Sequence, residues 1–102
     1  MGSKDLYIIQ CSGTGDVKIG VSQDVGRRLK ELQTGCPRYL KVLLVLKGRW
    51  DLERPFHNLL RQYGLMSRNT PGEWFIEEAL VHLPDWVYEQ LDLENQDWWR
   101  GR

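Results

Sequence analysis

The chain has 102 residues, of which 41% are hydrophobic, and this is enough for one modest core but not for two independent domains. No run approaches the roughly 18 consecutive apolar residues of a membrane span, and the first residues lack the apolar stretch of a secretory signal. We therefore expect one domain in a cytoplasmic protein. Cys11 and Cys36 form no CxxC pair, which predicts reduced, packing thiols rather than a zinc site.

The zero net charge conceals a division along the chain. Residues 1–72 contain twelve Lys/Arg and six Asp/Glu, a net charge of +6, whereas residues 73–102 carry −6. This division is compatible with phosphate binding on one face, although on charge alone simple solvation of the surface is the favoured explanation. If nucleic acid binds, we expect it against the basic part, away from residues 77–97.

Two short apolar runs open the chain, Leu6–Cys11 and Val17–Ser22, and a glycine-rich turn separates them. This pattern predicts a β-hairpin. Because side chains alternate along a strand, Lys18 and Gly20 share one face of the second run.

A helix is expected next, capped by Ser22 or Asp24 and ending near Gly35. Its apolar positions recur at helical spacing: Val25, Leu29 and Leu32. Arg28 lies beside this stripe, so its stem can follow the edge of the core while its guanidinium faces outward. The nearly apolar run Leu40–Leu46 then predicts a central strand covered on both faces.

A second amphipathic helix follows, with apolar residues at helical spacing: Leu52, Phe56, Leu59, Leu60 and Tyr63. Asp51 is the expected cap, Pro55 fits the first turn, and Gly64 ends the helix. Glu53 and His57 lie one turn apart at the border of the apolar stripe. This places a carboxylate and an imidazole at the rim of the core.

The remaining segment is less regular. After a polar loop from Met66 to Gly72, residues 73–76 fit either a short edge strand or the entry to two helices that Pro84 separates. The order of elements predicts an α+β domain, a three-stranded, mainly antiparallel sheet flanked by helices. We expect a single domain over 1–94, with its core at 5–76 and C-terminal helices at 76–94. The tail at 95–102 is either docked by Trp98 and Trp99 or disordered, and two adjacent exposed tryptophans would be unusual, which favours docking.

Several short motifs stand in a characteristic order. Asp5-Leu6-Tyr7 precedes Lys18-Ile19-Gly20, Arg28 follows Lys18 by ten residues, and Glu53 opens the second long helix. In this order they resemble the GIY-YIG nuclease superfamily, with Lys18 in place of the second motif's tyrosine and no counterpart to a late asparagine. The pairing of Glu53 with His57 and the run Gly72-Glu73-Trp74-Phe75 are similar to the phage-type branch. The resemblance covers residues 5–76.

The resemblance implies a divalent-metal-dependent endonuclease acting on DNA. Glu53 is then the ligand of Mg²⁺ or Mn²⁺, and Arg28 binds a phosphate. Tyr7 positions or deprotonates the attacking water, helped by the charge of Lys18. His57 is expected as a general base, a residue of the metal shell or a phosphate donor. The expected site therefore comprises five catalytic residues, Tyr7, Lys18, Arg28, Glu53 and His57, and four nucleic-acid contacts, Lys18, Gly20, Arg27 and Arg28.

Two other functions remain open. One is a non-catalytic nucleic-acid-binding module that keeps the nuclease fold, and the other is a protein-interaction adaptor that uses the acidic, tryptophan-rich C-terminal segment. For the nuclease, we expect Tyr7, Lys18, Arg28 and Glu53 to meet on one concave surface.

Overall fold

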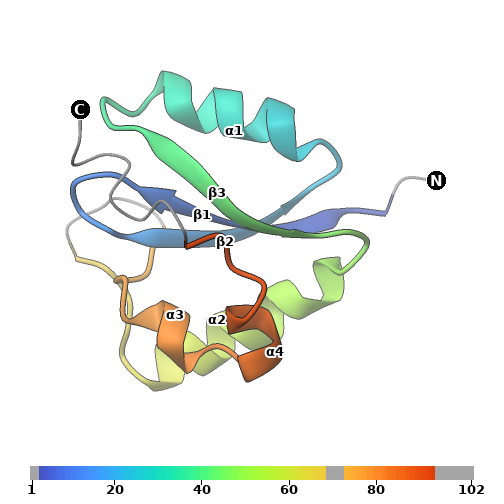
Figure 1. Ribbon diagram of the computed structural model, residues 1–102, viewed down its shortest axis with the longest axis vertical. Coiled ribbons are helices and arrows are strands. Elements are labelled where there is room, and N and C mark those ends of the chain that lie inside the picture. Colours follow the sequence, from blue (N-terminus) through green and yellow to red (C-terminus); the bar gives the residue numbers. More distant parts are fainter. Residues whose placement is uncertain (1–2, 69–72, 94–102) are drawn as a thin grey trace.

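The computed structural model describes residues 3–68 and 73–93 (Figure 1). The elements are β1 (Asp5–Cys11), β2 (Val17–Ser22), α1 (Val25–Thr34), β3 (Leu40–Leu46), the 3-10 turn η1 (Trp50–Leu52), α2 (Glu53–Gln62), α3 (Ala79–His82) and α4 (Asp85–Tyr88). The expected α+β class and the β-β-α-β-α order are confirmed. Gly72 and the expected tail with Trp98 and Trp99 lie outside the described residues.

The three strands form one antiparallel sheet in the order β2-β1-β3. The expectation that Leu40–Leu46 is the central strand is therefore wrong, because β1 pairs with both neighbours and β3 lies at an edge. Helices cover both faces of this small sheet, so even an edge strand is apolar on both sides. A continuous apolar run indicates that both faces of a strand are covered, but it does not indicate whether the strand is central or at an edge of the sheet.

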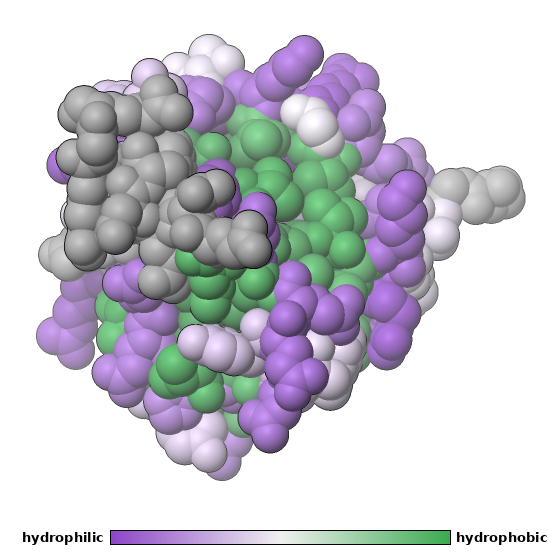
Figure 2. Space-filling view, in the orientation of Figure 1, coloured by the Kyte–Doolittle hydropathy of each residue, from purple (hydrophilic) through white to green (hydrophobic). Residues whose placement is uncertain are grey.

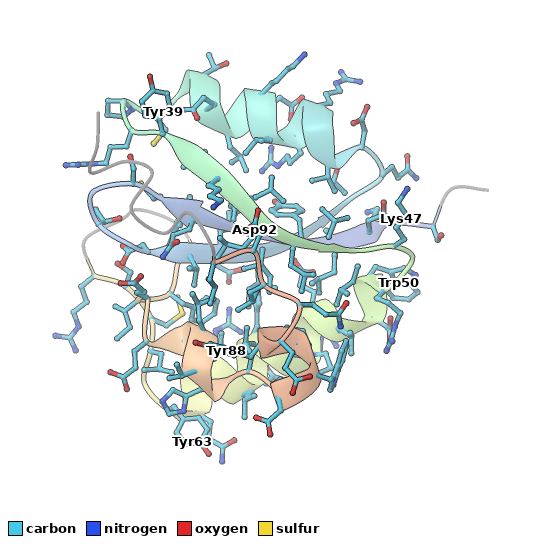
Figure 3. All side chains as sticks on the ribbon, viewed as in Figure 1. Tyr39, Lys47, Trp50, Tyr63, Tyr88 and Asp92 are labelled. Carbon is cyan, nitrogen blue, oxygen red and sulfur yellow. The ribbon has the colours of Figure 1, made fainter. Side chains whose placement is uncertain are left out.

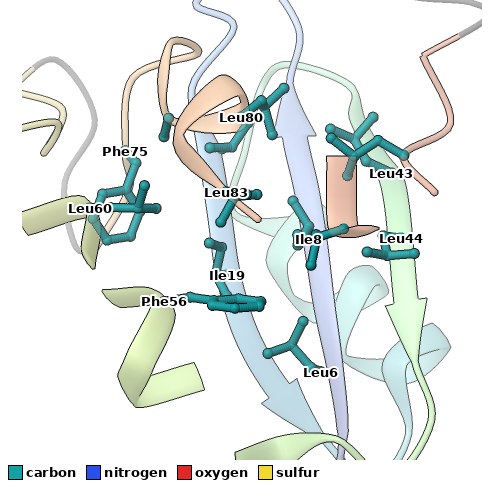
Figure 4. Close-up of a cluster of buried hydrophobic side chains, with 14 of the residues drawn as sticks. Leu6, Ile8, Ile19, Leu43, Leu44, Phe56, Leu60, Phe75, Leu80 and Leu83 are labelled. Carbon is teal, nitrogen blue, oxygen red and sulfur yellow. The ribbon is translucent and has the colours of Figure 1, made fainter. Parts of the chain in front are cut away.

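The sheet separates two hydrophobic clusters. α1 covers one face, and α2, α3 and α4 cover the other (Figure 1). Alternation along β1 sends Leu6 and Ile8 into the larger cluster with α2–α4 (Figure 4), and Tyr7 and Ile9 into the smaller cluster beneath α1. Figure 2 shows the apolar residues gathered in the middle of the molecule, between polar residues above and below.

The helix ends follow local chemistry, with one exception. The Asp24 carboxylate caps α1 by accepting the Arg27 backbone N–H at 3.0 Å, and Gly64, at φ +70°, follows the last turn of α2 as expected. Asp51 does not cap α2, because it lies within η1 and binds the Arg49 guanidinium at 3.1 Å. In the described part of the chain, no helix has the length and apolarity needed to cross a bilayer.

The outer edge of β2 is bordered by two distant segments. Val17 and Phe75 exchange backbone hydrogen bonds of 2.8 Å in both directions, and the Ile19 carbonyl accepts a hydrogen bond from the His57 ring. Residues 73–76 therefore lie along this edge, but they form no strand, since Phe75 makes only isolated bridges to Val17 and to Met66. This arrangement brings His57 of α2 to the edge of β2, and Trp74, next to Glu73, to Lys18 and the cluster beneath α1.

Large aromatic side chains are exposed mainly on the side of α2 to α4. Trp50, Tyr63 and Tyr88 lie on the outside of that layer, whereas Tyr39 lies beside the end of α1 (Figure 3). The candidate site described next lies elsewhere, around β2.

Candidate functional site at the edge of the sheet

Tyr7 forms the floor of the candidate site. It lies opposite Gly20 in the β1–β2 pairing and is only 2% exposed. The space where a β-carbon at position 20 would lie is filled by the phenol of Tyr7. Gly20 therefore lets the tyrosine lie across β2 beneath α1.

Arg28 on α1 lies above this tyrosine. Interaction with the Tyr7 hydroxyl, followed by that with Glu31, raises the pKa of Arg28. The guanidinium Nη1 lies 3.3 Å from Glu31 Oε1, and the Arg28 side chain is 42% exposed. The Arg28 guanidinium is thus held by the Tyr7 hydroxyl and is still accessible to solvent. Its neighbour Arg27 is far more exposed and pairs with Glu31 at 3.6 Å.

Lys18 lies on the same face of β2 as Gly20, opposite Ile9 of β1. Its Nζ is 5.9 Å from the centroid of the Trp74 ring, within the range of a cation–π contact. Burial lowers the pKa of Lys18, the Arg28 charge lowers it further, and the carboxylates of Glu73 and Glu53 oppose both effects. Lys18 therefore experiences charges from the α1 side and from the α2 side.

His57 is more buried than its expected place at the rim of the core, with 7% of its surface exposed. Its Nε2 lies 2.7 Å from the Ile19 carbonyl oxygen, so Nε2 carries the proton and donates. The other nitrogen, Nδ1, lies 3.6 Å from Glu73 Oε2, and the ring packs edge-on against Phe75 with centroids 5.3 Å apart. His57 thus joins α2 to the edge of β2.

Glu53 and Glu73 supply the negative charges of the site. Glu53 is the first residue of α2 and is partly exposed, and its carboxylate makes no hydrogen bond or ion pair with any other described residue. Glu73 binds the Arg61 guanidinium at 2.6 Å and faces His57. Glu53 is consequently the carboxylate with free coordinating oxygens.

The expectation that Tyr7, Lys18, Arg28 and Glu53 meet on one concave surface is wrong for Glu53. Tyr7, Lys18 and Arg28 are together on the α1 face, whereas α2, which carries Glu53, covers the opposite face (Figure 1). The two groups approach each other around the outer edge of β2, where Lys18 interacts with both. Glu73, Trp74 and Arg61 were not among the expected site residues, although the Glu-Trp-Phe run was a usable signal for the first two.

The side chains that could act as metal ligands indicate which kind of metal ion fits the site. Within residues 3–68 and 73–93, no group of three or more His, Cys, Asp or Glu side chains is arranged to hold a metal ion. A zinc site needs such a group, whereas Mg²⁺ keeps several waters and is held by one or two carboxylates together with phosphate oxygens. The unpaired carboxylate of Glu53 fits the second kind of site.

The fold and the site define a small α+β domain in which a tyrosine, a lysine and an arginine gather on one sheet face and carboxylates border its edge. The chain belongs to the T5orf172 domain family, and the match spans residues 6–93, which includes every helix and strand described above except the first residue of β1. No curated protein and no solved structure matches the chain.

Proposed function

We propose that this protein is a divalent-metal-dependent endonuclease of the GIY-YIG type that hydrolyses phosphodiester bonds in DNA. The observation that carries the proposal is the position of Lys18. It lies on the sheet face of Tyr7 beneath α1, its Nζ is 5.9 Å from the ring centroid of Trp74, and the charges of Arg28, Glu73 and Glu53 all act on it. Phosphoryl chemistry needs this combination of cations for the phosphate and a carboxylate for a metal. Membership of the T5orf172 family, found in phage and nuclease-like proteins, supports the proposal.

Each residue answers one chemical requirement. A phosphodiester repels nucleophiles because it is an anion, so charge on its oxygens must be neutralised. Arg28 presents a partly exposed guanidinium whose planar fork matches two phosphate oxygens. Lys18 adds a second positive charge beside it. The Tyr7 hydroxyl, held against Arg28, orients the attacking water and accepts its hydrogen bond.

Glu53 would hold Mg²⁺ or Mn²⁺, which, when bound, neutralises phosphate charge and makes a bound water more acidic. His57 has a different part in the proposal. Because its Nε2 is committed to the Ile19 carbonyl, it positions the edge of β2 relative to α2. Only Nδ1, on the side of Glu73, remains to interact with a substrate.

A non-catalytic DNA-binding module is the second candidate. It is favoured by the lysine at position 18, because an ammonium group donates to phosphate oxygens but has no lone pair with which to accept a proton from water. Both candidates predict DNA binding through Arg28 and Lys18, and only the nuclease predicts bond cleavage that depends on Glu53.

The test is the conversion of supercoiled plasmid to nicked or linear DNA, with Mg²⁺, with Mn²⁺ and with a chelator. Wild type is expected to cut only with metal, and Glu53→Gln is expected to lose cutting, since the amide keeps the shape but not the charge that anchors the cation. Asp85→Asn is the matched control, because Asp85 opens α4 as Glu53 opens α2. Equal cutting by wild type and Glu53→Gln would remove Glu53 as the ligand. No cutting with any metal would favour the binding module.

A further inference from the structure

A solvent-open groove of about 550 Å³ lies beside the first turns of α1. Its polar lining comes from the chain before β1, the end of β2 and α1: Lys4, Ser22, Asp24, Arg27, Arg28 and Glu31. Three of these side chains are cationic. Lys4 is exposed, and the Arg27 side chain is 79% exposed, so both are accessible to a ligand in the groove.

The groove is continuous with the candidate site, because Arg28 belongs to both. On one side Arg28 interacts with the Tyr7 hydroxyl, and on the other it lines the groove with Arg27. A polyanion whose phosphate lies at Arg28 therefore has a path past Arg27 towards Lys4. This path follows α1, whereas the acidic residues Glu77, Glu78 and Asp85 belong to the segment of α3 and α4 on the other face of the sheet (Figure 1).

The two negative charges in the groove have other partners. Asp24 accepts the Arg27 backbone N–H at the start of α1. Glu31 pairs with Arg27 at 3.6 Å and with Arg28 at 3.3 Å, and its side chain is 51% exposed. Exposed ion pairs of this kind are weak and salt-sensitive, so a phosphate with two or three charged-group contacts can replace Glu31 as the partner of both arginines.

We infer that this groove is a second phosphate subsite, in which Lys4 and Arg27 bind the nucleic-acid backbone next to the phosphate at Arg28, in competition with Glu31. The inference rests on the proposed function, which places a phosphate at Arg28. It fixes the direction in which the substrate strand leaves the site. It also requires a substrate that extends beyond the reacting phosphate on the side of α1's first turns.

The test measures the affinity of the full-length protein for a labelled duplex oligonucleotide of about 20 base pairs, in chelator, over a series of salt concentrations. The double variant Lys4→Ala/Arg27→Ala should bind more weakly, and the slope of log affinity against log salt should fall by about one for each lost phosphate contact. Glu31→Gln should bind more tightly than wild type, because it releases both arginines. Thermal melting checks that each variant is folded.

The matched control is Lys30→Ala/Arg38→Ala, which removes the same charge from exposed positions outside the groove. If it weakens binding as much as Lys4→Ala/Arg27→Ala, or if Glu31→Gln leaves affinity unchanged, the subsite is refuted. Binding in chelator is independent of cleavage, so the two proposals can fail separately. Groove variants that behave as expected in a protein that cuts no plasmid would retain the subsite and exclude the nuclease. The opposite pattern would retain the nuclease alone.

Discussion

The phenol of Tyr7 fills the space beside Gly20 in which the β-carbon of any other residue at position 20 would lie. We therefore expect Gly20→Ala to cost about 1–3 kcal/mol of stability, the usual cost of overpacking, and to displace Tyr7 from Arg28. Chemical denaturation measures the first effect, and plasmid cutting measures the second.

The control for this substitution is Gly26→Ala. Among the described residues, a β-carbon at Gly26 would approach only Asp24 Oδ1, at an ordinary van der Waals distance of 3.6 Å. Because glycine within a helix costs about 0.5–1 kcal/mol relative to alanine, Gly26→Ala should leave stability unchanged or raise it. Similar losses from both substitutions would show that the contact with Tyr7 is not the cause.

Lys18 should make stability depend on pH in a definite direction. Its pKa is lowered by burial in the folded protein, whereas in the unfolded chain it stays near the ordinary value of 10.5. Between these two values the unfolded chain binds more protons, so stability rises as the pH increases towards 10.5. The unfolding free energy of wild type minus that of Lys18→Met should therefore increase over this range.

Urea denaturation at a series of alkaline pH values measures this difference. Lys47→Met, which removes an exposed lysine, is the matched control for the loss of one ammonium group. A difference between wild type and Lys18→Met that stays flat as the pH rises would contradict the burial of the Lys18 charge.

His57 should stabilise the protein through the donor on its Nε2. His57→Ala leaves the Ile19 carbonyl without that donor, and we expect a loss of about 1–3 kcal/mol, with a further loss from the contact with Phe75. His57→Gln carries an N–H at a comparable reach and should retain part of this stability. Equal losses in the two variants, measured by urea denaturation, would indicate that ring packing rather than the hydrogen bond is responsible.

Charge reversal on the α1 face should weaken DNA binding in a salt-dependent way. We expect Arg28→Glu and Lys18→Glu each to lower affinity strongly at low salt, with the difference from wild type shrinking as salt increases. Lys47→Glu, on the turn after β3, is the matched control and should change affinity little. Unchanged affinity of both site variants at low salt would mean that nucleic acid binds elsewhere.

Local chemistry made much of the fold predictable from sequence. The cap at Asp24, the end of α2 at Gly64 and the shared face of Lys18 and Gly20 each depend on neighbours within a few positions, and all were found as expected. The face shared by Lys18 and Gly20 follows directly from alternation along a strand. The order of the motifs was likewise sufficient to nominate the residues of the site.

Only the tertiary structure decided which segments that are distant in the sequence lie side by side. β3 is apolar at the edge of the sheet because helices cover both faces, and its residues alone do not reveal which strand it pairs with. His57 binds Ile19, 38 positions away, and Glu73 meets Arg61 and His57 only because residues 73–76 follow the edge of β2. The sequence likewise did not reveal that Arg28 and Glu53 are carried by helices on opposite faces of the sheet. Such contacts depend on how distant segments bury their surfaces together, and no local pattern contains that information.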